Sequence, residues 1–559
     1  MINNDIDKKK SSLLFLGGLL VFTVLNFFTA GTLGIHFDEA YYWLWSKQPA
    51  TGYFDHPPMI SWLIAIGQLV FKNELGLRLL VIVMASLSMH LLWQMARTYI
   101  RQPLLFWALI YSVLLIHPYT FIATPDAPLF FFTVLFFYAY RQVLEKPDIY
   151  RIAAIAFASA MLLYSKYHGV LVLGFTLISN LKLLKNKKFW IYAVLLIVLM
   201  LPHLFWQIEN QFASFRYHLI DSHKTHYRLS VTIEYLLNQL LLTGPWLGWM
   251  FLYLLYKEKP GSSWEKALKL TGTGTFVFFL IATFSGDFEA HWTLLAFVPL
   301  LLITYRYLAS HPALHRWIYI GGGVNFMILL LVRIMVLTPV APQMKAFRFF
   351  YAWDADADMI QEAAGEHPVI FQDNWNKAGR YGWFTGQSQI SNLNSALHRR
   401  NQFDLWNRDE QLKGQTVVVV SSDSTQFETA QKLETPKMVW YLKTMPNFHS
   451  FYDLSFDLLE YTLADGVYSF AVQLNNPYPE KIIFGEDGHR AVFQLYRKNN
   501  SRWTLETEHE IETLSLSPNG SQPYSGRFCL PDDWQQSELY LMLRIGELNP
   551  IPVKYLLTN

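Results

Sequence analysis

Cysteine is almost absent from this sequence, since Cys529 is the only one in 559 residues. An intramolecular disulfide is therefore excluded, and any external domain must be stable without crosslinks. Charged residues are also scarce, at 16%, beside 52% hydrophobic and 16% aromatic residues. The formal net charge of +2 gives no reason to expect nucleic acid as a partner. A Walker loop and a dinucleotide fingerprint are missing as well.

Long apolar runs fill the first 337 residues and predict a polytopic α-helical membrane protein. The first run, 13–30, lacks a small-x-small cleavage site, so we interpret it as an uncleaved span rather than a signal peptide. Ten more runs bring the prediction to eleven spans, or about 11 to 13: 75–96, 104–122, 127–144, 152–165, 168–181, 189–207, 233–256, 268–284, 292–308 and 317–337. The shorter run 58–71 predicts a juxtamembrane or re-entrant helix.

Lysine and arginine gather in alternate connections between these runs. The basic connections lie at 97–101, 141–151, 182–188, 257–269 and 306–316. Because basic residues accumulate on the cytoplasmic side, the N-terminus is predicted inside and everything after residue 337 outside. We therefore predict a multi-pass protein of the bacterial inner (plasma) membrane with a periplasmic C-terminal domain.

The composition changes near residue 340, where turn signals and mixed polar sequence replace the apolar runs. We predict a transmembrane domain over 1–339, an external α/β domain over 340–437 and an external β-rich domain, like a β-sandwich, over 438–559. Within the first domain, the external loop 31–74 carries the densest group of candidate functional residues.

That loop contains two adjacent carboxylates, Asp38 and Glu39, followed by Tyr41, Tyr42 and two tryptophans. Tyrosine and tryptophan prefer the headgroup level of a membrane and carboxylates avoid hydrocarbon, so the stretch predicts chemistry at the membrane surface. An alternative is purely structural: Asp38 caps a helix and Glu39 stabilises its first turn.

Five segments together carry a resemblance to a known family. They are Phe37–Tyr42, Gly52–Pro58, Thr124–Asp126, Ser165–Tyr167 and Gly244–Gly248. In order and spacing, over 13–337, they resemble the C-type (GT-C) membrane glycosyltransferases of the protein O-mannosyltransferase and lipid A aminoarabinose transferase type. The resemblance implies a donor sugar on a polyprenyl (undecaprenyl- or dolichyl-type) phosphate.

The resemblance also implies roles for the acidic residues. Asp38 would be the catalytic carboxylate, with Glu39 beside it, and Asp126 would be the second acidic residue of the site. Independently, attack of a hydroxyl on an anomeric carbon needs a base, and a carboxylate under an apolar cover suits that task. The alternative for Asp126 is a helix N-cap.

A departing lipid phosphate needs cations, and we predict Lys166, His56 and Arg333 as its ligands. Lys166 has an alternative role as a lysine snorkelling to the interface. The remaining candidates for the substrate cavity lie on the predicted outer side: Tyr41, Tyr42, Asp55, Arg216, His218, Glu289 and His291. The histidine spacing does not favour a metal site.

The predicted function is inverting transfer of a sugar from a polyprenyl-phosphate donor to an acceptor hydroxyl on the outer face of the membrane. The acceptor can be a lipid, a glycan or a protein, and membrane lipids surround the enzyme. No cofactor is predicted beyond the lipid-linked donor, and a divalent metal is left open. Two alternatives stay open: an O-antigen-ligase-like transferase of oligosaccharides, and a transporter or flippase with an external glycan-binding domain.

Overall fold

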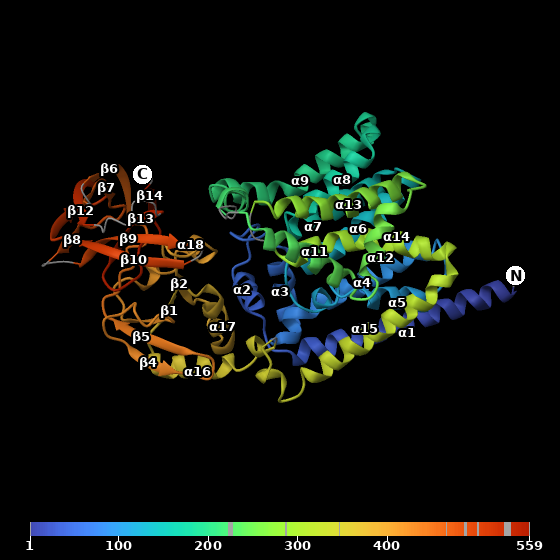
Figure 1. Ribbon diagram of the computed structural model, residues 1–559, viewed down its shortest axis with the longest axis horizontal. Coiled ribbons are helices and arrows are strands. Elements are labelled where there is room, and N and C mark those ends of the chain that lie inside the picture. The colour runs from blue at the N-terminus through green and yellow to red at the C-terminus, as the bar shows by residue number, and fades with distance from the viewer. Residues whose placement is uncertain are drawn as a thin grey trace. The chain divides into compact units, whose positions relative to one another are not determined.

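The computed structural model divides into two compact units, Met1–Tyr351 and Ala352–Asn559. It describes residues 2–221, 227–285, 288–345, 347–464, 467–485, 489–499, 502–529 and 538–557. In Figure 1 the first unit is helical and every labelled strand lies in the second unit.

The first unit consists of helices only, within those ranges. They are α1 (Ile2–Thr32), α2 (Phe37–Ser46), α3 (Met59–Val70), α4 (Glu74–Ala96), α5 (Pro103–Ser112), η1 (Pro118–Thr120), α6 (Asp126–Glu145), α7 (Ile149–Ser165), α8 (Gly169–Ser179), η2 (Leu181–Lys185), α9 (Lys187–Glu209), α10 (Ala213–Arg216), η3 (Tyr217–Asp221), α11 (Leu229–Thr243), α12 (Gly248–Lys257), α13 (Ser263–Ala282), η4 (Ala290–Ala296), α14 (Phe297–Ser310), η5 (Pro312–Leu314), α15 (His315–Met335), η6 (Ala341–Gln343) and η7 (Arg348–Phe350).

Six segments of the described chain are long and apolar enough to cross a membrane: Lys8–Thr32, Glu74–Ala96, Asp126–Glu145, Lys187–Glu209, Ala290–Ser310 and Pro312–Met335. Large apolar side chains of α9, such as Val194 and Ile197, are exposed. Exposure of these apolar side chains to water is unfavourable, whereas contact with lipid tails is favourable. These faces therefore contact lipid. Helix α3 has 12 residues, about 18 Å of helix, too short to cross the hydrocarbon core. Its length fits the predicted juxtamembrane helix.

Two predicted spans are interrupted. The run 233–256 forms α11 and α12, because Gly244 has φ +144° and a side chain there would meet the carbonyl oxygen of Ser112 at 2.6 Å. The run 104–122 ends its helix at Ser112. Beyond it, the N–H groups of Leu114 and Leu115 both donate to the carbonyl of Leu242. The two breaks therefore support each other through backbone hydrogen bonds.

The second unit begins with a five-stranded mixed sheet in the order β2-β1-β3-β5-β4. Strand β1 pairs in parallel with β2 and β3, and β5 is antiparallel to β3 and β4. The elements are α16 (Trp353–Ala364), β1 (Val369–Gln372), α17 (Trp375–Thr385), β2 (Ser391–Leu393), α18 (Phe403–Trp406), η8 (Glu410–Leu412), β3 (Val417–Ser421), β4 (Gln431–Glu434) and β5 (Val439–Met445). The sheet thus continues past residue 437, because β5 belongs to it.

The strands that follow form smaller sheets around a shared apolar core. They are β6 (Ser455–Ala464), β7 (Val467–Asn475), β8 (Ile482–Gly485), β9 (Ala491–Asn499), β10 (Arg502–Glu510), β11 (Thr513–Leu516), β12 (Ser521–Cys529), β13 (Leu539–Ile545) and β14 (Lys554–Leu557). Their sheets have the orders β10-β9-β13-β14, β12-β7-β6 and β11-β8. Phe470 of one sheet packs edge-on against Phe493 of another, with ring centroids 4.9 Å apart, as in a β-sandwich.

Candidate active site

Helix α2 begins with a capping box built from the predicted catalytic stretch. The N–H of Asp38 donates to His36 Nδ1 (3.3 Å), and the N–H of His36 donates to Glu39 Oε2 (2.9 Å). His36 is therefore the N-cap, and Asp38 lies in the first turn without capping the helix. The cap that we considered for Asp38 belongs to His36.

Glu39 is completely buried and is held by a buried arginine. Arg78 of α4 donates to both carboxylate oxygens, Nε to Oε1 (2.8 Å) and Nη2 to Oε2 (2.5 Å). The N–H of Ala123 donates to Oε1 as well (2.8 Å). Burial raises the pKa of Glu39, but Arg78 and the backbone donors outweigh it, so its pKa is lowered. With four hydrogen bonds to its oxygens, Glu39 is a positioning residue that fixes the start of α2.

Asp38 differs from its neighbour in exposure. Its side chain keeps 29% of its surface accessible, against 0% for Glu39, and Oδ2 lies 3.6 Å from His36 Nδ1. Of the two adjacent carboxylates, Asp38 is thus the one that a substrate hydroxyl can reach. Its place is fixed by the helix start that Glu39 anchors.

Asp126 and Lys166 form a second buried ion pair. Lys166 Nζ donates to both carboxylate oxygens of Asp126 at 2.8 Å, and both side chains are nearly inaccessible. His291 Nε2 lies 3.5 Å from Asp126 Oδ2. The structure places Asp126 at the first turn of α6 with Pro125 as N-cap. Neither alternative role, helix cap for Asp126 or snorkelling for Lys166, describes this geometry.

Tyr119 links the acidic residues. It lies in η1, and its ring centroid is 5.7 Å from that of His291. Burial, and then the carboxylates of Asp126, Glu289 and Asp38, raise the pKa of the Tyr119 hydroxyl. Three of the predicted acidic residues, from three separate segments, therefore act electrostatically on one hydroxyl.

The other predicted cavity residues form an aromatic and imidazole cluster. Tyr41 donates to Asp55 Oδ2 (2.7 Å), and His218 Nε2 lies 2.7 Å from the Asp55 carbonyl. The ring of His56 stacks 5.9 Å from that of His218 and lies 6.2 Å from that of Tyr42. Loop 52–58 is thereby packed against α2.

Two connections join the cluster to the acidic residues. Tyr42 lies four residues after Asp38, on the same face of α2. Tyr167, next to Lys166, makes an edge-on contact with His218 at 5.5 Å. Lys166, His218 and His291 all act electrostatically on His168. The ring contact of Tyr167 thus connects the imidazole of His218 to the segment that carries Lys166.

The side chains of two predicted site residues form no hydrogen bond or ion pair with the acidic residues of the site, within the described ranges. Arg333 of α15 donates to the Leu25 carbonyl (2.7 Å), Thr29 Oγ1 (2.7 Å) and Asn26 Oδ1 (2.8 Å), so it ties α15 to α1. Arg216 is exposed, and its side chain forms no hydrogen bond or ion pair with a residue of the described ranges. These contacts offer no support for either side chain as a phosphate or cavity ligand.

Two residues of the site were missed from the sequence. Arg78 is not among the residues predicted for the site, although an arginine inside an apolar run is itself a signal of a buried partner. Tyr119 carries no local signal. In the part of the chain that the structure describes, no group of three or more His, Cys, Asp or Glu side chains is arranged to hold a metal.

The helical unit has a carboxylate-bearing helix directly after the first span, as the resemblance to the GT-C membrane glycosyltransferases predicted. The fold is similar to that of ArnT from Cupriavidus metallidurans in the apo state, with a TM-score of 0.54 and 13% identity over 78% of this chain and 98% of that one. The same protein bound to undecaprenyl phosphate gives 0.53 and 15%, with the same coverage. The predicted fold class is thereby confirmed.

Sequence comparison identifies relatives of the same class. Residues 55–206 match the family model described as dolichyl-phosphate-mannose-protein mannosyltransferase. The chain is 23% identical over 300 residues to lipid A galacturonosyltransferase RgtD of Rhizobium johnstonii, across 51% of this chain. The alignment spans 63% of that relative, less than two thirds of its length. The chain is a homologue of GT-C glycosyltransferases, which confirms the resemblance drawn from the sequence motifs.

Proposed function

We propose that the protein transfers a sugar from an undecaprenyl-phosphate-type donor to an acceptor hydroxyl. The observation that carries the proposal is the partly accessible carboxylate of Asp38, in the first turn of a helix whose start is fixed by His36 and Glu39. A buried Asp126–Lys166 ion pair lies in the same unit. The relatives support the donor class, since one is a lipid A galacturonosyltransferase and the similar fold has been seen with undecaprenyl phosphate.

In the proposed reaction, Asp38 takes the proton of the acceptor hydroxyl as its oxygen attacks the anomeric carbon. The bond from that carbon to the phosphate oxygen breaks, and its electron pair leaves with the polyprenyl phosphate. Attack opposite the leaving group inverts the anomeric configuration. His36, whose Nδ1 lies 3.6 Å from Asp38 Oδ2, stabilises the carboxylate when protonated.

The leaving phosphate gains charge and needs a cation. We propose Lys166 as that cation, because its ammonium is buried at the site and carries three N–H groups, two of which bind Asp126. The imidazoles of His56 and His218 are the proposed neighbours of the phosphate. No organic cofactor enters this scheme, because the donor bond is already activated.

We also propose that the reaction takes place on the outer face of the inner membrane, with the N-terminus cytoplasmic. The basic residues of η2 and the start of α9, Lys182, Lys185, Lys187 and Lys188, support a cytoplasmic place for that connection. Asp38 then lies on the opposite side, one helix after the N-terminus. A lipid, glycan or protein hydroxyl is the proposed acceptor.

Purified protein in detergent, given synthetic undecaprenyl-phosphate sugars and candidate acceptors, tests the proposal. We expect acceptor-dependent release of undecaprenyl phosphate and a glycosylated product of inverted configuration, detected by mass spectrometry and NMR. Parallel reactions with Mg²⁺ and with EDTA measure metal dependence. A donor that crosses vesicle membranes intact, with no bond cleaved, would instead identify a flippase.

The Lys166 proposal predicts a result for a double variant. Lys166→Met alone leaves the Asp126 carboxylate buried without its ion-pair partner, so we expect lost stability together with lost donor affinity. Combining it with Asp126→Asn removes the uncompensated charge and should restore stability. If Lys166 binds the phosphate, the double variant stays at least about tenfold weaker in donor binding, since contacts to charged groups contribute about 1.5–3 kcal/mol. Recovery of donor affinity together with stability would make Lys166 a structural residue only.

A further inference from the structure

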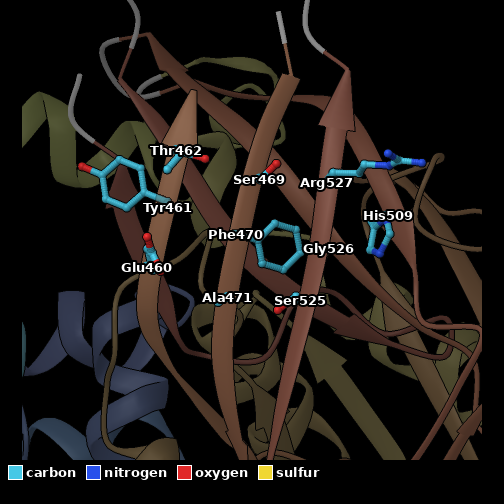
Figure 2. A pocket seen from close by; sticks show the side chains of 10 residues that line it. All are labelled: Glu460, Tyr461, Thr462, Ser469, Phe470, Ala471, His509, Ser525, Gly526 and Arg527. Carbon is cyan, nitrogen blue, oxygen red and sulfur yellow. The ribbon is translucent and has the colours of Figure 1, made fainter. Parts of the chain in front are cut away.

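The second unit carries a groove that the proposed reaction does not use. It encloses about 510 Å³ on the sheet of β6, β7 and β12. That volume lies within the range of about 300–1,000 Å³ usual for small-molecule sites. Figure 2 shows that its lining side chains come from these three strands, with His509 added by β10.

Strand register arranges the groove as two rungs of outward side chains. The rungs are Glu460–Ala471–Ser525 and Thr462–Ser469–Arg527. The central strand β7 contributes only the small Ser469 and Ala471, so the floor is low. The longer Glu460 and Arg527 stand on the two outer strands and form the sides.

Aromatic and imidazole rings lie beneath the sheet that carries the groove. Phe470 and its register partner Tyr461 lie between the two rungs, so both side chains point to the opposite face of the sheet, where Phe470 is buried. Figure 2 shows Phe470 and His509 close to Gly526. A side chain at Gly526 would come within 2.6 Å of Phe470 Cζ and of His509 Cδ2. The glycine thus allows both rings to pack directly beneath the groove.

The polar side chains of the two rungs are not engaged in hydrogen bonds or ion pairs within the part of the chain that the structure describes. Glu460, Thr462, Ser469, Ser525 and Arg527 form no side-chain hydrogen bond or ion pair with any residue in the described ranges. Their hydroxyls donate and accept, the carboxylate accepts, and the guanidinium donates five N–H groups. A small concave surface with this mixture is complementary to a ligand that carries many hydroxyls.

Charge narrows the ligand class further. The carboxylate of Glu460 and the guanidinium of Arg527 stand on opposite sides and give no net formal charge, which disfavours a multiply charged anion such as a phosphate. The polar floor disfavours a lipid chain, which would leave Ser469 and Thr462 without partners. A neutral sugar satisfies both conditions, because its hydroxyls donate and accept hydrogen bonds while it carries no charge.

We propose that this groove is a second carbohydrate site, which binds one or two neutral sugar residues of a glycan. The site lies in the second unit and goes beyond the proposed transfer reaction. Its occupation does not depend on Asp38, so Asp38→Asn should bind the glycan as the wild type does.

The test uses full-length protein in nanodiscs on an array of immobilised neutral hexosides, amino sugars, uronosides and phosphorylated sugars. We expect binding to at least one neutral glycan. Ser469→Tyr fills the groove with a residue that strands favour, and it should weaken this binding at least about tenfold. Arg527→Ala removes a donor from one side and should also weaken it.

Thr504→Tyr is the matched control, because Thr504 is also exposed on a strand but lies outside the groove. It should bind like the wild type, and circular dichroism should show the same fold for all variants. Three results would each overturn the proposal: no binding to any neutral glycan, equal binding by Ser469→Tyr and the wild type, or binding restricted to phosphorylated sugars. None of these bears on donor cleavage by the first unit.

Discussion

Asp38→Asn is expected to lower transfer by about 100- to 10,000-fold while the protein folds normally, because general-base catalysis contributes rate factors of that size. The amide cannot take the acceptor proton but has nearly the shape of the carboxylate. The backbone N–H of Asp38, which donates to His36, is kept. The measurement is the rate of undecaprenyl-phosphate release under single turnover, at saturating donor.

Asp148→Asn provides the control for a purely structural carboxylate. Asp148 is a true N-cap, of α7, and its side chain accepts from the N–H of Arg151. We expect it to change stability by about 1 kcal/mol or less and to leave transfer near the wild-type rate. If Asp38→Asn behaved like Asp148→Asn, Asp38 would have no part in the chemistry.

Much of the fold could be predicted because a helix that crosses a bilayer must be long and apolar, and such runs are visible in the sequence. Apolar runs gave nearly every helix of the first unit, including the short α3. The breaks at Ser112 and Gly244 could not be predicted, because each depends on backbone bonds to the other. In the second unit, β5 was assigned to the wrong side of a boundary, since strand pairing across a sheet leaves no local signal.

In the site, as in the fold, residues that are close together in the sequence could be predicted, whereas contacts between distant residues could not. Asp38 and its aromatic neighbours stand together in the sequence, so they were found. Glu39 and Arg78 are 39 residues apart, and Asp126 and Lys166 are 40 apart. The sequence identified three of these four as site residues but could not show which charges neutralise each other. A pairing of that kind is decided only when the helices pack.

Glu39→Gln is expected to destabilise the protein by about 3–5 kcal/mol, because it leaves the guanidinium of Arg78 buried without its counter-charge. Arg78 also donates to the carbonyls of Ala30, Leu33 and Gly34, at the end of α1. Loss of the pair therefore loosens both the end of α1 and the start of α2. Thermal unfolding in mild detergent measures the effect.

Two further variants make the Glu39 measurement specific. Glu145→Gln breaks the exposed pair with Arg141, and such pairs contribute about 0–1 kcal/mol, so its stability should hardly change. Glu39→Gln combined with Arg78→Met removes both charges and should be more stable than Glu39→Gln alone.

The pH dependence of stability provides an independent test of the role of Glu39. Its pKa in the folded protein is lowered from the ordinary value of 4.5, so the folded state binds a proton less readily than the unfolded chain. The stabilisation is therefore fully present above pH 4.5 and is lost as the pH falls through the folded pKa. Glu39→Gln should flatten this acid-side loss relative to the wild type. If Glu39→Gln kept wild-type stability and this pH dependence but transferred sugar hundreds of times more slowly, Glu39 would act in the chemistry itself, as its place beside Asp38 first indicated.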